Sequence, residues 1–392
     1  MTHSEKVIAL VERNVDIPCP HAVEIGSEVD LDRISNHGVR INTGCRLYGP
    51  ETFIASGARI GTEGPVSLDN CHVGPDVELK SGHFKKAVFL EGASLGYGSH
   101  VREGTILEEQ ASTAHCVGLK QTILMPFVTL GSLINFCDCL MAGGTSRKNH
   151  SEVGSSFIHF NFTPNQDKAT PSLLGDVPNG VFLNQQPIFM GGQGGLVGPC
   201  RIAYGTVSAA GTIVRKDQLK PNYLIFGGAG KGGSIPWKPG GLSVSNRIIK
   251  NNMVYIGNLL ALRDWYGHVR RAFVSNRFPE DLWQGLIKTL DMGINERFKK
   301  LSDYIERLGE STQASHYNDF EQRYRERNQE LGDLNLRDQF MRQLEPFKSQ
   351  QGNYIETIKT LSSETVLVGT QWLQSVVDTV MADGDGIIVS SS

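Results

Sequence analysis

The sequence predicts a mainly-β solenoid, in which the chain winds into a three-sided prism, followed by a C-terminal α-helical region. Apolar residues recur at every sixth position, and glycines are concentrated between Gly26 and Gly241. A period of six belongs neither to a helix nor to a single strand, whose side-chain periods are 3.6 and 2. Beyond Gly241, glycines become sparse and long charged and apolar stretches follow, which predicts the helical region.

The sixfold repeat is clearest in residues 89–112, FLEGAS-LGYGSH-VREGTI-LEEQAS, and returns in IASGAR-IGTEGP and LVGPCR-IAYGTV-SAAGTI-V. One such unit suits a short strand and a tight turn, and three units complete a coil of about 18 residues. Small residues are expected at the corners, where space or an unusual φ requires them. The residues expected to point into the prism are Ile54, Ile60, Val73, Leu79, Phe89, Leu95, Val101, Leu107, Leu196, Ile202, Ser208 and Val214.

These patterns divide the chain into an N-terminal segment (1–20), a solenoid (21–244) and a helical region (245–392). The spacing of apolar residues predicts a helix from about Ser245. Pro279 is expected to start a second helix, with Glu280 and Asp281 in its first turn.

Further helices are expected over 316–347 and 350–381, with a frayed end or a short strand after them. We expect the helical region to cover the prism and to pack along it, since a solenoid must protect its open edges. The alternative is that its charged helices recruit a partner or form a lid over the substrate.

Composition excludes several classes of protein. The 392 residues carry a net charge of −3, which gives no reason to expect nucleic acid or an anionic membrane as a partner. No stretch approaches the ~20 apolar residues of a membrane span. Glu12 and Arg13 interrupt the first apolar run, so no signal peptide is expected. Seven cysteines without a CxxC pattern indicate reduced, mostly buried thiols, a cytoplasmic location and no metal.

Three segments carry a closer resemblance: CVGLKQTIL, VGSSFIHFNFTPNQDKATPSLLGD and GTVSAAGTIVRKD. Residues 21–240 resemble the hexapeptide-repeat, left-handed parallel β-helix superfamily. Residues 116–217 resemble the acetyltransferase domain of the bifunctional glucosamine-1-phosphate acetyltransferase / N-acetylglucosamine-1-phosphate uridyltransferase family. The resemblance implies a homotrimer in which acetyl-CoA lies between two prisms and acylates an amino sugar, sugar phosphate or nucleotide-linked sugar. That family's nucleotidyltransferase domain has no counterpart before the prism, so uridyl transfer is not expected.

The same resemblance implies roles for individual residues. Lys120 would hold a sugar phosphate and Asn161 would position the sugar. Independently of the resemblance, positively charged loop residues near the same end could bind a phosphate or the CoA pyrophosphate, or could equally be solvated; they are Arg147, Lys148 and Lys168. The residues implied to line the CoA groove are Ser155, Gln185, Ala210 and Gly211.

Two positions depart from the family pattern. Asn135 stands where the family has its catalytic histidine, and an asparagine cannot accept a proton at neutral pH. Proton transfer typically contributes about 10²–10⁴-fold in rate. Glu152 replaces a second asparagine of the site. These departures favour the competing hypothesis of a non-catalytic protein that binds a sugar nucleotide or scaffolds an assembly.

A replacement base is predicted from strand alternation in FIHFNF. In that interpretation Ile158, Phe160 and Phe162 fill the prism, whereas His159 and Asn161 share the outer face with Phe157. His159 would then take the proton as the acceptor attacks the thioester, with Glu152 orienting the ring. The alternative is a surface histidine hydrogen-bonded across coils.

The sequence also contains segments that resemble a zinc site and a phosphate-binding loop. His115, His150 and His159 could hold zinc between subunits, as in γ-type carbonic anhydrases, but their spacing does not reproduce that pattern. FGGAGKGGS lacks the GK[ST] ending of a phosphate-binding loop, because Gly232 follows Lys231. A glycine-rich flap, with Lys231 touching an anion, is the alternative for this segment.

Overall fold

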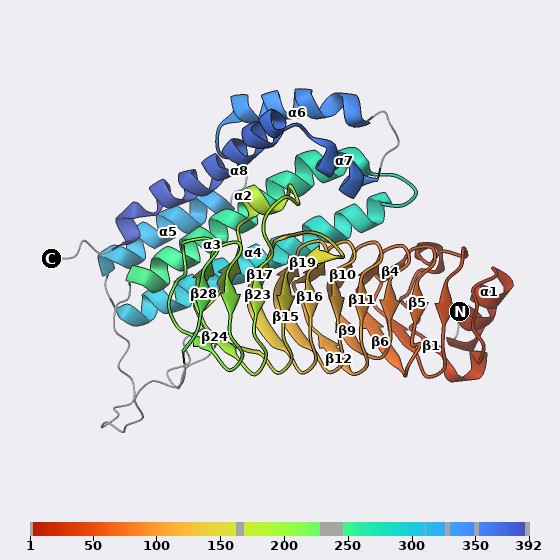
Figure 1. Cartoon of the computed structure of the whole chain (residues 1–392). Helices are drawn as coiled ribbons and strands as arrows, with labels where there is room; N and C mark the ends of the chain where they lie inside the picture. The colour runs from red at the N-terminus through yellow and green to blue at the C-terminus, as the bar shows by residue number, and fades with distance from the viewer. Residues whose placement is uncertain are drawn as a thin grey trace, which may run out of the picture.

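The chain forms a β-solenoid with a layer of helices stacked along one side, which confirms the predicted fold class (Figure 1). The computed structural model describes residues 3–161, 168–227, 246–309, 311–325, 330–348 and 353–388. Helix α1 (His3–Glu12) lies at the N-terminal end of the solenoid. There the Lys6 ammonium donates to main-chain carbonyls of the first coil, including that of Ser27 at 2.7 Å.

Two sheets, of 16 and 10 strands, wrap around the solenoid axis and form its three faces. Strands of successive coils pair in parallel on every face. Two long strands, β15 and β17, bend at a corner and contribute to two faces. Face 1 contains β1 (Glu24–Ile25), β3 (Arg46–Tyr48), β6 (Val66–Asp69), β9 (Gly82–Lys85), β12 (Ser99–Val101), β21 (Ile158–Phe160), β24 (Gly195–Val197), β27 (Ile213–Val214) and the first halves of β15 (Gly118–Leu124) and β17 (Asn135–Met141). Face 2 contains β4 (Phe53–Ile54), β7 (His72–Val73), β10 (Ala87–Phe89), β13 (Thr105–Leu107), β22 (Ser172–Leu174), β25 (Arg201–Ile202) and the second halves of β15 and β17. Face 3 contains β2 (Arg40–Ile41), β5 (Arg59–Ile60), β8 (Glu78–Leu79), β11 (Ser94–Leu95), β14 (Ser112–Thr113), β16 (Thr129–Leu130), β20 (Glu152–Val153), β23 (Phe189–Met190), β26 (Val207–Ser208) and β28 (Leu224–Ile225).

The sixfold repeat fills the prism as the sequence predicts. Phe89, Leu95, Val101 and Leu107 are each 0% exposed. Fully burying such a side chain stabilises the fold by roughly 1.5–3 kcal/mol relative to leaving it in water. The other residues predicted to face inwards are buried as well: Ile54, Ile60, Val73, Leu79, Leu196, Ile202, Ser208 and Val214.

The corners turn through residues in the left-handed region. At the corner between faces 2 and 3, Gly57, Asp76 and Gly92 have φ values of 74°, 54° and 68° in successive coils. A Cβ on Gly57 would lie 2.1 Å from Oδ1 of Asp76 in the next coil, so this position requires glycine.

Within the described residues, two insertions leave the solenoid at a corner. The antiparallel hairpin β18 (Gly144–Ser146) and β19 (Asn149–His150) leaves at the 2–3 corner. The segment with the short helix α2 (Val177–Gly180) leaves at the same corner. Residues 162–167 and the glycine-rich segment with Lys231 lie outside the described residues.

The helical region starts with α3 and is more finely divided than expected. Pro279 is the N-cap of α4, which confirms the predicted second helix. The further helices expected over 316–347 and 350–381 are present, with two helices in each range. The elements are α3 (Asn246–Asp264), η3 (Trp265–Val269), η4 (Arg270–Phe273), α4 (Glu280–Leu308), α5 (Ser311–Arg325), α6 (Leu334–Lys348), α7 (Tyr354–Thr360), α8 (Ser363–Asp383) and η5 (Asp385–Ile387).

Helix α4 runs along face 2 and contacts β7, β10 and β13. Gly285 allows this approach, because a Cβ there would lie 2.4 Å from the His72 ring. Asp281 near the start of α4 pairs with Arg33 of the first coil at 2.5 Å. The predicted packing of helices along the prism is therefore confirmed. Helix α4 covers the outer surface of face 2 at these strands.

Candidate functional site

The outer surface of face 1 brings together three of the predicted site residues. The ladder places His100 of β12 beside Gly118 of β15, and Gly118 beside Asn135 of β17. One step along the strands, Lys120 pairs in register with Cys137. Lys120 and Asn135 therefore share a surface, to which Asn161 is joined at its edge.

At Gly118 one outward position of this surface carries no side chain, and this opening lies between His100 and Asn135. A Cβ at Gly118 would meet nothing closer than Oδ1 of Asn135, at 3.5 Å. Neighbouring strands are about 4.8 Å apart, so the His100 and Asn135 backbones are separated by roughly 10 Å across the glycine.

Lys120 is half-buried, and its Nζ lies 3.0 Å from Oε1 of Glu103. Burial opposes ionisation of Glu103, but the hydrogen bond from Lys120, a backbone hydrogen bond and the charges of Lys120 and Arg102 together outweigh it, so the pKa of the carboxyl is lowered. The ammonium has three donors, so it can hold Glu103 and an anionic ligand together.

Asn161 is tied to the helical region through a buried ion pair. Its Nδ2 donates to Oδ2 of Asp138 at 3.2 Å. Oδ1 of Asp138 accepts from Nη2 of Arg297 on α4 at 2.6 Å, and the two charged side chains are only 8% and 3% exposed. Asn161 thus has a fixed orientation at the 1–2 corner. Lys168 follows the undescribed residues 162–167 and is exposed.

The predicted orientation of the FIHFNF strand was wrong. Ile158 pairs with the outward-facing Asn135, so Ile158 and Phe160 face outwards and are 40% and 43% exposed. His159 faces the prism interior and is 2% exposed. The sixfold count explains the difference, because six residues after the inward Val153 is His159 rather than Phe160.

His159 is a satisfied core residue and not the outward base that we expected. Its Nδ1–H donates to the Cys137 carbonyl at 2.5 Å, which leaves Nε2 to accept from the Ser172 hydroxyl at 2.9 Å. Burial lowers the pKa of His159 to about 4, so the ring is neutral at physiological pH. Glu152 cannot orient it, because Glu152 faces outwards on face 3, where it lies 3.5 Å from Nε2 of His150.

The surface contains residues that sequence reasoning missed. His100 is exposed, and its ring centroid lies 5.5 Å from that of His83 on the preceding coil. Burial, followed by the charge of His100, lowers the pKa of His83. The sixfold register could have revealed His100, since it precedes the inward Val101 and must therefore point outwards. Cys137 shares the surface, but burial raises the pKa of its thiol to about 11, which makes it a poor nucleophile.

The residues implied to contact CoA lie at two different corners. Ser155 is exposed at the 3–1 corner, where its Oγ accepts from the Ser132 amide at 3.1 Å. Ala210 and Gly211 are exposed at the same corner two coils later, and a Cβ on Gly211 would meet nothing within 4 Å. This corner therefore presents small, exposed residues on successive coils.

Gln185 is separated from this wall. It lies in the insertion at the 2–3 corner, where it lines a cavity of about 560 Å³ between the last coils and helices α3 and α8. The structure therefore does not join Gln185 to Ser155 and Ala210 within one chain.

The remaining candidates have structural partners. Nη1 of Arg147 donates to the Phe127 carbonyl at 2.7 Å and to the Gln110 carbonyl at 3.0 Å, so it fixes the β18–β19 hairpin on the solenoid. Nδ1 of His115 lies 2.9 Å from the Ser132 hydroxyl. With His159 inside the prism, the three histidines weighed for zinc do not converge, and within the described ranges no three potential ligands do.

Comparison with known proteins identifies relatives of the solenoid. The chain is 26% identical over 230 residues to the Bifunctional protein GlmU of Thermotoga maritima, which covers 57% of this chain and 44% of that protein. It is 26% identical over 239 residues to the protein of the same name from Nitratidesulfovibrio vulgaris (strain DP4), covering 59% and 46%. The chain thus spans less than half the length of these curated relatives, and no family model matches it. The resemblance predicted from the sequence is therefore confirmed, at 26% identity to these two relatives.

One further property concerns membranes. Among the helices of the described residues, none combines the length and the apolar character that crossing a bilayer requires.

Proposed function

We propose that this protein transfers an acyl group, in the first instance acetyl, from CoA to an amino sugar, a sugar phosphate or a nucleotide-linked sugar on face 1. The observation that carries the proposal is the opening at Gly118, bordered by His100, Lys120 and Asn135. The similarity to proteins named GlmU supports the same chemistry. Lys120 would hold the phosphate, and Asn135 and Asn161 would hydrogen-bond the sugar.

In this reaction the acceptor amine attacks the thioester carbonyl carbon, the C–S bond breaks and the CoA sulfur leaves. The attacking nitrogen must lose a proton, and neither Asn135 nor the buried His159 can take it. We assign that role to His100, whose exposed imidazole borders the opening. General-base catalysis by a histidine contributes about 10²–10⁴-fold.

A homotrimer would complete the groove for acetyl-CoA. Phe189, Val207 and Leu224 face outwards in register on three successive strands of face 3 and are 40%, 39% and 58% exposed. A stripe of adjacent apolar side chains favours burial against another surface. It flanks the 3–1 corner of Ser155 and Ala210, where a neighbouring prism would form the second wall. All seven cysteines are free thiols, which supports the proposed cytoplasmic location.

The second candidate function is non-catalytic binding of a sugar nucleotide. It is favoured by Asn135, which stands at the position of the family's histidine and cannot act as a base. Lys120 and Asn161 would serve a binding protein equally well.

The test is CoA release from acetyl-CoA in the presence of a panel of amino sugars and their phosphates. We expect turnover by the unaltered protein, a loss of about 10²-fold or more in kcat for His100→Ala, and no loss for the exposed His115→Ala. If the unaltered protein releases no CoA, while a sugar nucleotide raises its melting temperature, the binding function replaces the enzymatic one.

A further inference from the structure

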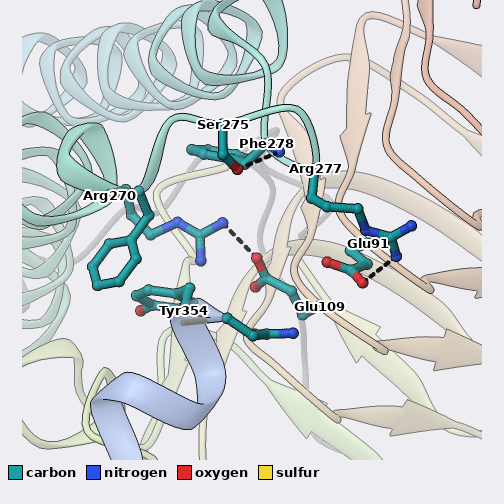
Figure 2. A pocket seen from close by; sticks show the side chains of 9 residues that line it. Glu91, Glu109, Arg270, Ser275, Arg277, Phe278 and Tyr354 are labelled. Carbon is teal, nitrogen blue, oxygen red and sulfur yellow. Dashed lines mark hydrogen bonds and ion pairs between the residues drawn. The ribbon is translucent and has the colours of Figure 1, made fainter. Parts of the chain in front are cut away.

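A cavity of about 180 Å³ lies where the helical region meets the 2–3 corner of the solenoid (Figure 2). Glu109, in the turn after β13, lines it from the solenoid side. Arg270 and Phe278 line it from the segment between α3 and α4, and Tyr354 lines it from the start of α7. The cavity is separate from face 1 and plays no part in the proposed acyl transfer.

Arg270 is the central group of this cavity. Its side chain is 1% exposed, and its guanidinium carbon lies 3.8 Å from the Tyr354 ring centroid and 4.5 Å from that of Phe278. Nη2 donates to Oε1 of Glu109 at 2.5 Å. Nε and Nη1 of Arg270 and Oε2 of Glu109 are buried and have no hydrogen-bond partner among the residues that the structure describes.

Such unpaired groups are costly. A buried donor or acceptor without a partner lowers the stability of the fold, and a charged group lowers it more. The backbone around Arg270 is also irregular, because a π-helical turn at Trp265–Val269 comes directly before it. Single π-helical turns occur frequently at functional sites.

The pattern of unpaired groups defines a ligand. Arg270 needs an acceptor, and Oε2 of Glu109 needs a donor. The charges that line the cavity balance, since Glu91 and Glu109 face Arg270 and Arg277, and Arg277 pairs with Glu91. A neutral group with an oxygen acceptor and an N–H donor satisfies both requirements.

We propose that this cavity binds the acetamido group of an N-acetylated amino sugar. The carbonyl oxygen accepts from Arg270, the N–H donates to Glu109, and the methyl group packs against Phe273 and Phe278. This inference rests on the proposed function, because an N-acetylated amino sugar is the product of that reaction. The site is a product sensor at the joint between the solenoid and the helices.

The experiment is isothermal calorimetry with N-acetylglucosamine and, as its matched amine, glucosamine. Ser275→Trp places an indole in the cavity from an exposed position, and Asn276→Trp is the matched control on the neighbouring exposed residue outside the lining. Lys120→Ala removes a face 1 contact and leaves the cavity intact. Circular dichroism and thermal melting verify that each variant folds.

We expect N-acetylglucosamine to bind at least about tenfold more tightly than glucosamine, since the amine leaves the cavity groups unpaired. Ser275→Trp abolishes this preference for the acetylated sugar, while Asn276→Trp and Lys120→Ala retain it. Equal affinity for the two sugars, a preference that survives Ser275→Trp, or no binding at all overturns the proposal and leaves a cavity filled by water. Sugar bound on face 1 adds a component that Ser275→Trp does not remove, so the preference lost in that variant reports on the cavity alone, and a failure of the proposed acyl transfer would appear in the CoA-release assay instead.

Discussion

Nη2 of Arg297 on α4 lies 2.6 Å from Oδ1 of Asp138 on β17, and this pair of buried charges joins the helical region to the corner beside face 1. Asp138 occupies a left-handed corner position with φ 62° and also accepts from the amide of Asn161. The orientation of a proposed sugar-binding residue therefore depends on a helix more than a hundred residues further along the chain.

Arg297→Ala is expected to destabilise the protein by about 3–5 kcal/mol, because it leaves the Asp138 carboxylate buried and unpaired. Urea unfolding followed by circular dichroism measures the change. The control is Lys80→Ala, which breaks the 2.6 Å pair with Glu63 on the exposed surface and should cost no more than about 1 kcal/mol. Equal losses in the two variants would show that the buried pair has no special role.

His159 makes the stability depend on pH. Its pKa is about 4 in the folded protein against 6.5 for the unperturbed side chain. As the pH falls, the His159 ring is therefore protonated in the unfolded chain before it is protonated in the folded one. The stabilisation is fully present above pH 6.5 and is lost as the pH falls from 6.5 towards 4. The shift corresponds to roughly 3 kcal/mol for this group.

The measurement is the free energy of unfolding at pH 7 and pH 5 for the unaltered protein and for His159→Leu, which matches the apolar residues at the other inward positions. The variant should lose less stability on acidification than the unaltered protein. Part of the pH dependence should remain, because burial also lowers the pKa of His72 to about 4. An unchanged pH dependence in His159→Leu would contradict the buried, neutral assignment.

Lys120→Ala is expected to raise KM for a phosphorylated amino sugar about tenfold or more, since a charge-assisted hydrogen bond to phosphate contributes roughly 1.5–3 kcal/mol. The KM for acetyl-CoA should stay unchanged. Lys85→Ala is the control on the same face, because Lys85 lies 2.9 Å from Asp69, away from the opening at Gly118. A similar rise in both variants would indicate general surface charge in place of a phosphate contact.

Val207→Asp tests the proposed trimer. A carboxylate in the middle of the Phe189–Val207–Leu224 stripe would lose its water when the stripe is buried in an interface. This cost opposes assembly and does not arise in the isolated chain. Light scattering after gel filtration should show a trimer for the unaltered protein and a smaller species for the variant. Ser94→Asp, further along the outer surface of face 3, is the control and should leave the trimer intact. Loss of the trimer in both variants would contradict an interface at the stripe.

The fold was predictable because the solenoid repeats a local rule. Each block of six places one side chain inside, so the inward positions within an uninterrupted run, such as Phe89 to Leu107 or Leu196 to Val214, follow from counting alone. The same count gives His159 an inward position. The error came from assuming that the apolar residues of one strand, Ile158 and Phe160, face the interior. Strand alternation then placed His159 on the outside.

The site was less predictable because its parts meet through contacts between distant segments. Arg297 and Asp138 are 159 residues apart, and no local pattern pairs them. The gap at Gly118 exists only because three strands from successive coils lie side by side, with His100 and Asn135 on either side of the glycine. Likewise, Gln185 separates from Ser155 because an insertion moves it to another corner.

The most direct measurement for the central claim is a crystal structure of the protein with CoA and an amino sugar phosphate. The account predicts sugar density over Gly118 on face 1, with the phosphate at Lys120 and the amino group within hydrogen-bond reach of His100. Sugar density at any other place on the solenoid, with this opening empty, would contradict it.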